Sequence, residues 1–357
     1  MRVVQLRIRG LRNLSEVELE LSAGINVLVG SNGAGKTSVL EAVFLMAHAQ
    51  SFRGGSAESL VFRGGGRLEV FVELMRQDGR IRRVGLMREG ARWVGRVDGR
   101  ALRGISELLS ECAVVSFDPG SHALIGAGAE VRRRFLDWSV FHVEPEFYGI
   151  SQSYRRALRQ RNALLKASGS EDELAAWDEE LVRWADRVHE LRSRYLAVWE
   201  PTVVGRAEEL LGELGSATLS YARGWKSGVS LMEALEADRG RDRRRGFSHS
   251  GPHRADWSLV FEGAPGREFL SRGQEKLCAL ACAMSQATVY AELTGEWPIV
   301  CFDDLASELD LAHRQRAVKW LQASGAQVLI SGTDCPSELL GACTLFHVEQ
   351  GRIDTLL

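Results

Sequence analysis

Short segments in which apolar residues alternate or cluster recur near the start of the chain and again toward its end, and they predict β-strands. The turns near the start include Asp78-Gly79 and Asp98-Gly99, residue pairs that favour tight hairpins between antiparallel strands. We therefore expect an antiparallel sheet lobe in this region. The predicted strands are 3–8, 17–21, 25–29, 68–74, 82–87, 93–97 and 113–117, and later 218–221, 257–261, 299–302 and 327–330.

The middle of the chain has a helical period instead. A helix is expected over about 146–167, with one apolar face. In a second helix the apolar positions step by three and four, a heptad-like seam typical of helix packing. Ser170 and Glu173 form a capping-box pattern after a short turn, so the two helices should form an antiparallel hairpin, and Pro201 should end or kink the second. The seam residues are Leu174, Trp177, Leu181, Trp184, Val188, Leu191, Tyr195 and Val198.

Composition narrows the class of protein. The chain has 357 residues and a formal net charge of −2, so bulk charge does not indicate nucleic acid and any basic surface must be local. The six cysteines show no zinc-ligand spacing, and several lie in apolar contexts, which favours reduced, buried thiols. No apolar run reaches the roughly 20 residues of a membrane span, and the start of the chain resembles a strand rather than a signal peptide. We expect a soluble, cytoplasmic protein.

The segment from Gly30 to Thr37 matches G-x-x-x-x-G-K-[ST], between a predicted strand and a predicted helix. Glycines let backbone N–H groups surround phosphate oxygens, Lys36 supplies a cation near the β- and γ-phosphates, and the Thr37 hydroxyl faces Mg²⁺. The sequence therefore predicts a nucleoside triphosphate site, with ATP and Mg²⁺ as cofactors. The expected nucleotide contacts are Gly30, Ser31, Asn32, Gly33, Ala34, Gly35, Lys36, Thr37 and Ser38.

A second anion site is expected where Ser271 precedes a helix predicted over about 274–293. The free N–H groups and the dipole of a helix N-terminus favour negative charge. A monomer that already binds its nucleotide through Lys36 has no evident use for this site. We therefore expect a two-fold dimer in which Ser271, Gly273 and Gln274 close on the γ-phosphate held by the partner. S-x-G-Q alone is a weak motif and could be a plain capped helix.

Two carboxylates end the apolar strand predicted at 299–302. Asp303 occupies the position at which a Walker-B Asp holds Mg²⁺, and Asp304 could polarise the attacking water. The segment 307–310 resembles the D-loop of ATP-binding-cassette (ABC) ATPases. The next strand ends at Ser331, where transporter cassettes usually have a His, and Asp304 replaces the usual Glu. Slow hydrolysis is therefore expected.

Read together, these motifs resemble the SMC-like branch of ABC ATPases, and within it the RecF family of recombination and repair proteins. The short hairpin, in place of a long coiled coil, agrees with that family. The resemblance implies an α/β, P-loop ATPase head of the ABC/SMC type, with an antiparallel β lobe and an inserted helical-hairpin lobe. The blocks that carry it are 6–14, 29–41, 132–138, 160–163, 249–256, 270–276 and 303–310.

The resemblance also implies a function: an ATP-dependent homodimer in recombinational repair and replication-fork maintenance, associated with the nucleoid. It would bind gapped, junction or duplex DNA and work with the mediators RecO and RecR to load RecA, with hydrolysis as the off switch. Clusters of arginine support DNA binding, although a solvated charged face explains each equally well. The candidate DNA contacts are Arg53, which resembles the SMC arginine loop, and Arg132, Arg133, Arg155 and Arg156.

Lys36 and Ser271 lie about 235 residues apart, so both ends of the chain should build the head. Residues 1–130 would form its N-terminal part with the β lobe, 131–245 the helical lobe, and 246–357 its C-terminal part. Two other functions stay open: the ATPase subunit of a membrane transporter, and a nuclease-associated repair ATPase. The roles of His249, His253 and the Asp118-Pro119 loop are also open, although Gly251-Pro252 argues against a helical metal pair of histidines.

Overall fold

The computed structural model describes residues 1–54, 57–62, 67–90, 92–167 and 169–356. The chain divides into two compact units, one made of Met1–Ser121 with Gln286–Leu357 and the other of His122–Ser285. The helical lobe predicted over 131–245 lies inside the second unit, which extends further because β10 (Asp256–Phe261) pairs with β9 (Ala217–Ala222). No helix in the described ranges is long and apolar enough to cross a membrane.

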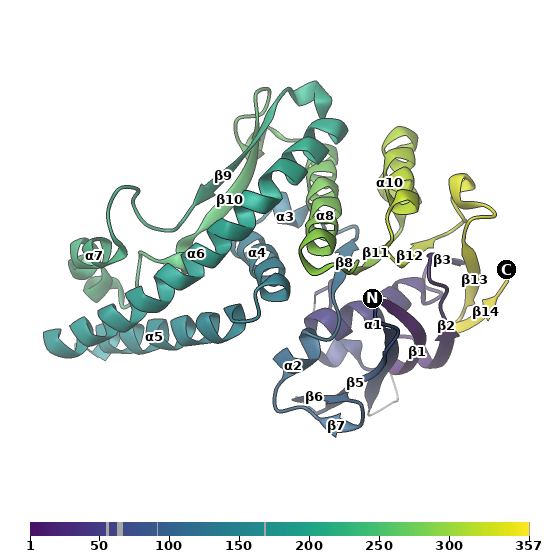
Figure 1. Ribbon diagram of the computed structural model, residues 1–357, viewed down its shortest axis with the longest axis horizontal. Helices are drawn as coiled ribbons and strands as arrows, with labels where there is room; N and C mark the ends of the chain where they lie inside the picture. Colours follow the sequence, from purple (N-terminus) through teal and green to yellow (C-terminus); the bar gives the residue numbers. More distant parts are fainter. Residues whose placement is uncertain (55–56, 63–66, 91, 168, 357) are drawn as a thin grey trace. The chain divides into compact units, whose positions relative to one another are not determined.

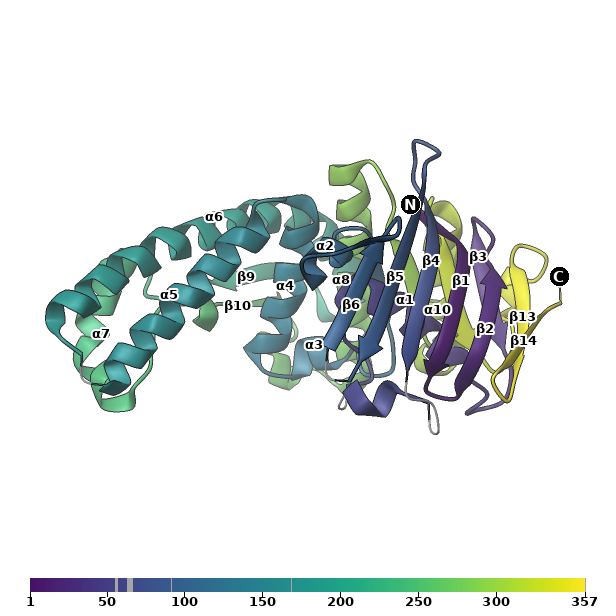
Figure 2. The ribbon, with the colours of Figure 1, turned by 90° about the horizontal axis from the view of Figure 1, so that it is seen from below.

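An antiparallel sheet in the first unit has the order β2-β1-β4-β5-β6-β7 (Figure 2). The predicted antiparallel lobe is therefore confirmed, and its tight turns fall where Gly79 and Gly99 have positive φ angles of 80° and 79°. The long central strands bury one apolar face, with alternate residues at 0–1% exposure in β4. The strands are β1 (Arg2–Leu11), β2 (Leu14–Glu20), β4 (Leu68–Met75), β5 (Ile81–Glu89), β6 (Arg92–Val97) and β7 (Arg100–Ala101).

The second sheet of this unit has the order β14-β13-β3-β12-β11-β8. All neighbours are parallel except β13 and β14. Because parallel strands end at one edge of a sheet, the segments after β3, β11 and β12 meet there. The strands are β3 (Ile25–Val29), β8 (Val114–Phe117), β11 (Ile299–Phe302), β12 (Val328–Gly332), β13 (Thr344–Glu349) and β14 (Arg352–Thr355).

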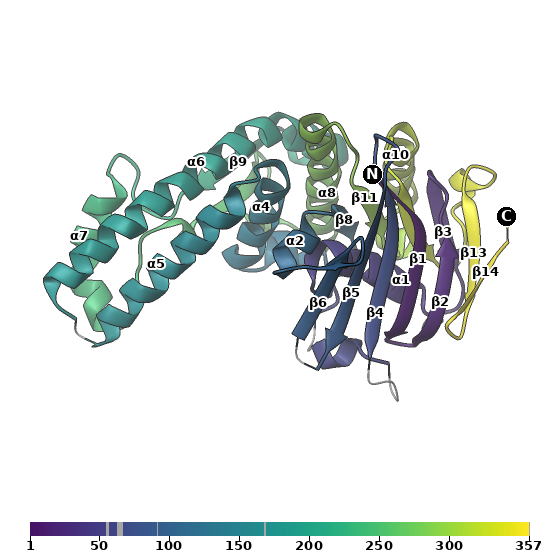
Figure 3. The same ribbon diagram turned by 60° about the horizontal axis from the view of Figure 1, so that its bottom comes forward.

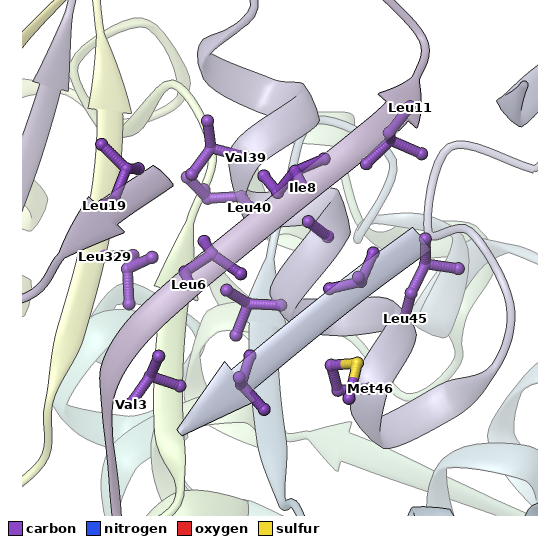
Figure 4. Close-up of a cluster of buried hydrophobic side chains, with 14 of the residues drawn as sticks. Val3, Leu6, Ile8, Leu11, Leu19, Val39, Leu40, Leu45, Met46 and Leu329 are labelled. Atoms are coloured by element: carbon purple, nitrogen blue, oxygen red, sulfur yellow. The ribbon is translucent and has the colours of Figure 1, made fainter. Parts of the chain in front are cut away.

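Helix α1 (Lys36–His48) lies in the core of the unit, and Figure 4 shows its Val39 and Leu40 beside Ile8 of β1, with Leu329 of β12 nearby. These residues are 0–1% exposed, and α1 contacts strands of both sheets. Burial of this kind stabilises a core by about 1.5–3 kcal/mol per large side chain and fixes the helix start beside the end of β3. The other helices of the unit are η1 (Ala57–Leu60), α2 (Ile105–Leu109), α9 (Leu305–Glu308), α10 (Leu311–Ala323) and η5 (Ser337–Leu339).

The second unit is built around the helical hairpin of α5 (Phe147–Ala167) and α6 (Glu171–Leu210), which lie side by side in Figures 1 and 3. Ser170 and Glu173 form the predicted capping box. Pro201 does not end the second helix, because α6 continues through it to Leu210, and the alternative of a kink at Pro201 stays a prediction. Buried Val203, Ala207 and Leu210 continue the packed face, which offsets the roughly 3 kcal/mol cost of an internal proline.

The remaining elements of the second unit surround the hairpin. Trp199 of α6 and Trp257 of β10 are 0–1% exposed and pack edge to face, with ring centroids 5.0 Å apart. The aromatic contact joins the strand pair to the hairpin. The other elements are α3 (Ala123–Gly126), α4 (Ala129–Val143), η2 (Gly212–Leu214), α7 (Leu231–Arg245), η3 (Pro252–Arg254), η4 (Arg267–Phe269) and α8 (Arg272–Thr294), whose last residues belong to the first unit.

Candidate nucleotide-binding site

A cavity of about 510 Å³ lies in the first unit, where the segments that follow β3, β11 and β12 meet. Segments far apart in the sequence contribute to it, as the parallel sheet predicts. Residues from the glycine-rich loop face the two predicted carboxylates across this space. The lining residues are Arg12, Asn13, Asn32, Gly33, Gly35, Lys36, Thr37, Ser38, Arg53, Pro119, Asp303, Asp304 and Ser331.

The loop between β3 and α1 needs glycine at its two ends. Gly30 has φ 154°, and a Cβ atom there would lie 2.1 Å from the carbonyl oxygen of Val348. Gly35 has φ 122°, and a Cβ atom there would lie 2.8 Å from a methyl carbon of Leu14. Both positions combine a left-handed backbone with a close neighbour, so the loop conformation excludes side chains at these points.

Lys36 lies at the start of α1, with its ammonium group against the loop. Its Nζ donates to the carbonyl oxygens of Gly30 at 2.7 Å and Ser31 at 2.9 Å. Gly35 precedes the helix and has no side chain to cap it, so the first backbone N–H groups of α1 point toward the cavity without a side-chain cap. A cation and an uncapped helix N-terminus together favour a bound phosphate.

Gly30, Ser31 and Ala34 belong to the loop but not to the lining of the cavity. The first two bind the Lys36 ammonium, and the Ala34 carbonyl accepts a 2.8 Å hydrogen bond from the Gly351 N–H group. The turn between β13 and β14 therefore holds the glycine-rich loop through this hydrogen bond.

The Asp303 carboxylate accepts two hydrogen bonds on the same oxygen. Thr37 Oγ1 donates to Oδ1 at 2.8 Å and Ser331 Oγ donates to it at 2.5 Å. Burial raises the pKa of Asp303, while these two hydrogen bonds lower it. Burial disfavours the charged form of this carboxylate, and a nearby cation would stabilise it. Asp303 is therefore suited to be a metal ligand.

The oxygen atoms of Thr37 and Asp303 fit Mg²⁺, which prefers oxygen ligands and usually takes only one or two from protein side chains. The described part of the chain has no group of three or more His, Cys, Asp or Glu residues placed to hold a metal. A magnesium ion here would therefore depend on phosphate oxygens and water for its other ligands.

Asp304 has a strained backbone, with φ 56°. Its N–H group donates to Ser331 Oγ at 3.0 Å, and its Oδ1 accepts from Ser307 Oγ at 2.9 Å. A left-handed conformation in a residue other than glycine costs about 1–3 kcal/mol and persists where the surroundings enforce it. These bonds fix the carboxylate of Asp304 beside the cavity.

Sequence reasoning gave no role to four residues that line this cavity, namely Arg12, Asn13, Pro119 and Ser331. Arg12 has φ 54°, and its guanidinium donates to both carboxylate oxygens of the fully buried Glu41 at 2.8 and 2.9 Å. Asn13 Nδ2 donates to the Gly33 carbonyl at 2.9 Å. The sequence did contain a signal for Arg12. Tight turns between strands that need a left-handed backbone usually have Asn or Gly at that position, and arginine there is unusual.

Arg53 lines the cavity as well, and its charge lowers the pKa of Asp303. Its N–H group donates to Ser51 Oγ at 3.0 Å, and the Ser51 hydroxyl donates in turn to Glu41. Glu41 thus anchors Arg12 directly and the Arg53 turn through Ser51.

The predicted second anion site lies in the other unit, at the start of α8. Ser271 Oγ accepts from the Gln274 N–H group at 3.3 Å, and Gln274 Oε1 accepts from the Ser271 N–H group at 3.0 Å. Ser271 and Gly273 are exposed on this unit. A reciprocal cap of this kind leaves other N–H groups of the first turn free to meet an anion.

The structure contradicts the expectation that Arg132 contacts DNA. Arg132 is 3% exposed and donates to both oxygens of Asp256 at 2.7 and 2.9 Å, and also to backbone carbonyls near α3. It shares the buried face of α4 with Leu136 and Val140, so its charge pairs with Asp256 inside the unit and does not face solvent.

The other basic clusters divide in the same way. Arg133 is half-buried and donates to the Ala255 carbonyl at 2.7 Å, whereas Arg155 and Arg156 are exposed on α5. Arg161, at the end of the same run, is fully buried between Asp178 at 2.5 Å and Asp242 at 2.7 Å. Exposed basic charge therefore remains only in part of each cluster.

The residues whose roles were open have structural partners. His253 lies 2.6 Å from the Tyr154 hydroxyl and 3.0 Å from the Ser248 carbonyl, and His249 lies 2.7 Å from Asp242. Burial lowers the pKa of His253 to about 4, so this ring is neutral at physiological pH. In the Asp118-Pro119 loop, burial raises the pKa of Asp118, which accepts hydrogen bonds from Gly120 and Ser121.

Comparisons with known proteins agree with this geometry. The family model described as the RecF/RecN/SMC N terminal domain matches residues 2–337. The DNA replication and repair protein RecF of Xanthomonas euvesicatoria pv. vesicatoria (strain 85-10) is 48% identical over 361 residues, covering 99% of this chain and 98% of that protein. The protein of the same name from Shewanella baltica (strain OS223) is 35% identical over 365 residues, covering 100% of both.

Solved structures show the same fold. One of the recombination mediator protein RecF with ATP, in the RecFOR pathway, superposes with a TM-score of 0.88 at 26% identity, covering 99% of this chain and 97% of that one. A Smc head bound to the C-winged helix domain of ScpA has a TM-score of 0.61 at 15% identity, covering 100% and 97%. The predicted fold class, an α/β head of the ABC/SMC type, is confirmed.

Proposed function

The chain belongs to the RecF/RecN/SMC family, and we propose that it is an ATP-binding protein of DNA replication and recombinational repair, with ATPase activity. One observation carries this proposal. The glycine-rich loop, Lys36, Asp303 and Asp304 line a single cavity with two further arginines.

In this function each group has a defined task. The Lys36 ammonium and the start of α1 bind the β- and γ-phosphates of ATP, and Arg12 and Arg53 add charge at the rim. Thr37 and Asp303 hold Mg²⁺, which neutralises charge on the phosphates when it is bound. Asp304 accepts a proton from the attacking water, or orients it, from a carboxylate fixed by Ser307.

The test is calorimetric titration of the whole chain with Mg-ATP. Lys36→Ala should lose at least tenfold in ATP affinity, because a charge-assisted contact contributes about 1.5–3 kcal/mol. Lys319→Ala, which removes an exposed lysine from α10, should bind ATP as the wild type does. Equal affinity of the two variants would reject the assignment of the loop.

The finer proposals concern assembly and DNA. ATP should drive a two-fold dimer in which Ser271, Gly273 and Gln274 meet the nucleotide of the partner, and slow hydrolysis should release it. The dimer would bind gapped or junction DNA and act with RecO and RecR to load RecA. In support, a similar protein, at 26% identity, carries ATP and is described as a recombination mediator in the RecFOR pathway.

Light scattering with ATP and gapped DNA tests the dimer. Ser271→Arg should still bind ATP but stay monomeric, because a bulky cation would block the proposed contact. Ser230→Arg is a matched control, since Ser230 forms the same kind of capping box with Glu233 at the start of α7. If Ser271→Arg dimerises as well as Ser230→Arg does, the proposed dimer is wrong.

A further inference from the structure

Two of the six free cysteines differ from the expectation of buried thiols. Cys112, Cys278, Cys282 and Cys301 are buried as expected, but Cys335 and Cys343 are only half-buried. Their sulfur atoms lie 3.9 Å apart, near enough for one thiol to donate weakly to the other. The two residues enclose η5 in the yellow segment that leads into β13 (Figure 1).

The loop between these cysteines is held at its centre. Leu339 is 0% exposed, and Glu338 accepts from Arg314 of α10 at 3.2 Å. The Cys335 thiol also donates to the Pro336 carbonyl at 3.6 Å. Because the loop is anchored by these contacts, the proximity of the two thiols is a property of the folded first unit rather than a chance approach of two free chain ends.

From this geometry we propose that Cys335 and Cys343 form a dithiol site that small-molecule disulfides oxidise to an internal disulfide. A disulfide bond is about 2.05 Å long, so the sulfur atoms must approach by about 1.9 Å from their 3.9 Å separation. Rotation of the two half-buried side chains must supply this movement. The proposed site consists of the two thiols alone and requires no metal ion.

The reaction proceeds in two balanced steps. The thiolate of one cysteine attacks oxidised glutathione, forming a mixed disulfide and releasing one reduced glutathione. The second cysteine then attacks the protein sulfur of the mixed disulfide, closing the internal bond and releasing the second glutathione. Two protons are lost from the protein thiols and both are taken up by the two glutathione thiolates.

Burial and the neighbouring thiol raise the pKa of Cys335 to about 11, so little of it is thiolate at neutral pH. Attack by the Cys335 thiol should therefore be slow at pH 7, and it should accelerate by up to about tenfold for each unit by which the pH rises toward 11. The site should therefore react slowly at neutral pH, unlike a fast catalytic thiol pair.

The site lies on the chain beside the nucleotide site. Ser331 lies in β12, four residues before Cys335, and donates a hydrogen bond to Asp303. Cys343 directly precedes β13, which pairs with β3. The disulfide would shorten the free connection between these two strands. It is a modification site independent of the proposed nucleotide function, and its test does not use ATP.

The experiment treats the whole folded chain with oxidised glutathione at pH 8.5 and measures intact mass after acid quenching. The wild type should lose two hydrogen atoms and keep no glutathione, and peptide mapping should join Cys335 to Cys343. Cys335→Ser and Cys343→Ser should each keep one glutathione adduct instead, because the second attack is impossible. A wild type that keeps the adduct, or that reacts at neither cysteine, would overturn the proposal.

A second measurement uses phenylarsine oxide, a trivalent arsenical that binds two adjacent thiols. It should protect both cysteines of the wild type from alkylation and should protect neither single variant. Cys278→Ser is the matched control, because this thiol is buried and its removal should leave the protection unchanged. Protection in the single variants, or none in the wild type, would contradict a dithiol site.

Discussion

The buried carboxylate of Glu41 on α1 should contribute more to stability than any exposed ion pair of the antiparallel sheet. Glu41 is fully buried on α1 and accepts two hydrogen bonds from Arg12 and one from Ser51. Glu41→Gln keeps one oxygen acceptor but turns an amide N–H₂ group toward a guanidinium, which also only donates. The variant therefore loses a charge-assisted hydrogen bond and leaves a donor unpaired.

The magnitude follows from the burial of the pair. A hydrogen bond to a charged group contributes about 1.5–3 kcal/mol, and breaking a fully buried ion pair costs about 3–5 kcal/mol. Arg12 keeps 21% of its side-chain surface exposed and can turn toward water, so the lower range applies. We expect Glu41→Gln to lose about 2–3 kcal/mol of unfolding free energy, which lowers the Tm of a unit of this size by roughly 5–10 °C.

The same change should weaken ATP binding by roughly tenfold or more, because Arg12 and the Arg53 turn lose their common anchor and must be ordered by the nucleotide. Thermal unfolding and calorimetry measure the two effects separately. Glu18→Gln is the control: Glu18 also pairs with an arginine of β1, Arg7, but both side chains are more than half exposed, and such pairs contribute less than about 1 kcal/mol. If Glu41→Gln has the same Tm and the same ATP affinity as Glu18→Gln, the anchoring role of Glu41 is refuted.

Three further predictions concern turnover, DNA and pH. Asp304→Asn should keep Mg-ATP binding, which depends on Asp303, and hydrolyse ATP more slowly; wild-type turnover in a phosphate-release assay would remove Asp304 from the mechanism. Replacing Arg155 and Arg156 with Ala should reduce the slope of log K against log salt by up to about 0.9 per lost phosphate contact on duplex DNA, and an unchanged slope would mark them as a solvated face. Burial lowers the pKa of His48 to about 4 from an ordinary 6.5, so the unfolded state binds the proton first and stability falls as pH drops from 6.5 toward 4. Because His48 as a whole residue is only half-buried, we expect about 2 kcal/mol between pH 7 and 4.5 in urea titrations, and His48→Gln should lack this loss.

The glycine-rich loop and the two carboxylates could be predicted from the sequence because they are local patterns joined to apolar strands. A strand followed by glycines and Lys36 fixes a backbone path, and a strand that ends in Asp303 fixes a carboxylate at the same edge of a parallel sheet. Glu41 and Ser331 could not be predicted in this way. Their partners come from the turn after β1, the 51–54 turn and the segment after β11, and only the tertiary structure brings these together.

The misassignment of Arg132 has a physical reason that the sequence contained. A run of arginines suggests a charged surface, but helical period decides which side chain points outward. Arg132 shares a face with Leu136 and Val140 at intervals of four and eight, and Arg161 does so with Ala157 and Leu165. Both arginines are buried and paired with Asp. The helical period therefore predicts their burial better than the charge of the run does.

Backbone strain gives an independent argument for the location of the site. Two hairpin turns of the antiparallel sheet have a non-glycine residue at positive φ, Asp98 at 48° and Arg12 at 54°. Asp98 is followed by Gly99, and Asp-Gly is a relaxed choice for such a turn. Arginine is not relaxed there, since a left-handed residue with a long side chain costs about 1–2 kcal/mol.

The cost at Arg12 is tolerated where its guanidinium meets both Glu41 and the nucleotide cavity, and the strained Asp304 lines the same cavity. The remaining strained positions have local explanations: Ala49 caps the end of α1, and Gln350 lies in the turn between β13 and β14. Of the five non-glycine residues with positive φ in the described ranges, two from distant parts of the sequence, Arg12 and Asp304, therefore line the proposed ATP site. That coincidence is expected if the fold holds a cation and a carboxylate in place before the nucleotide arrives, rather than letting ATP order them at a cost in affinity.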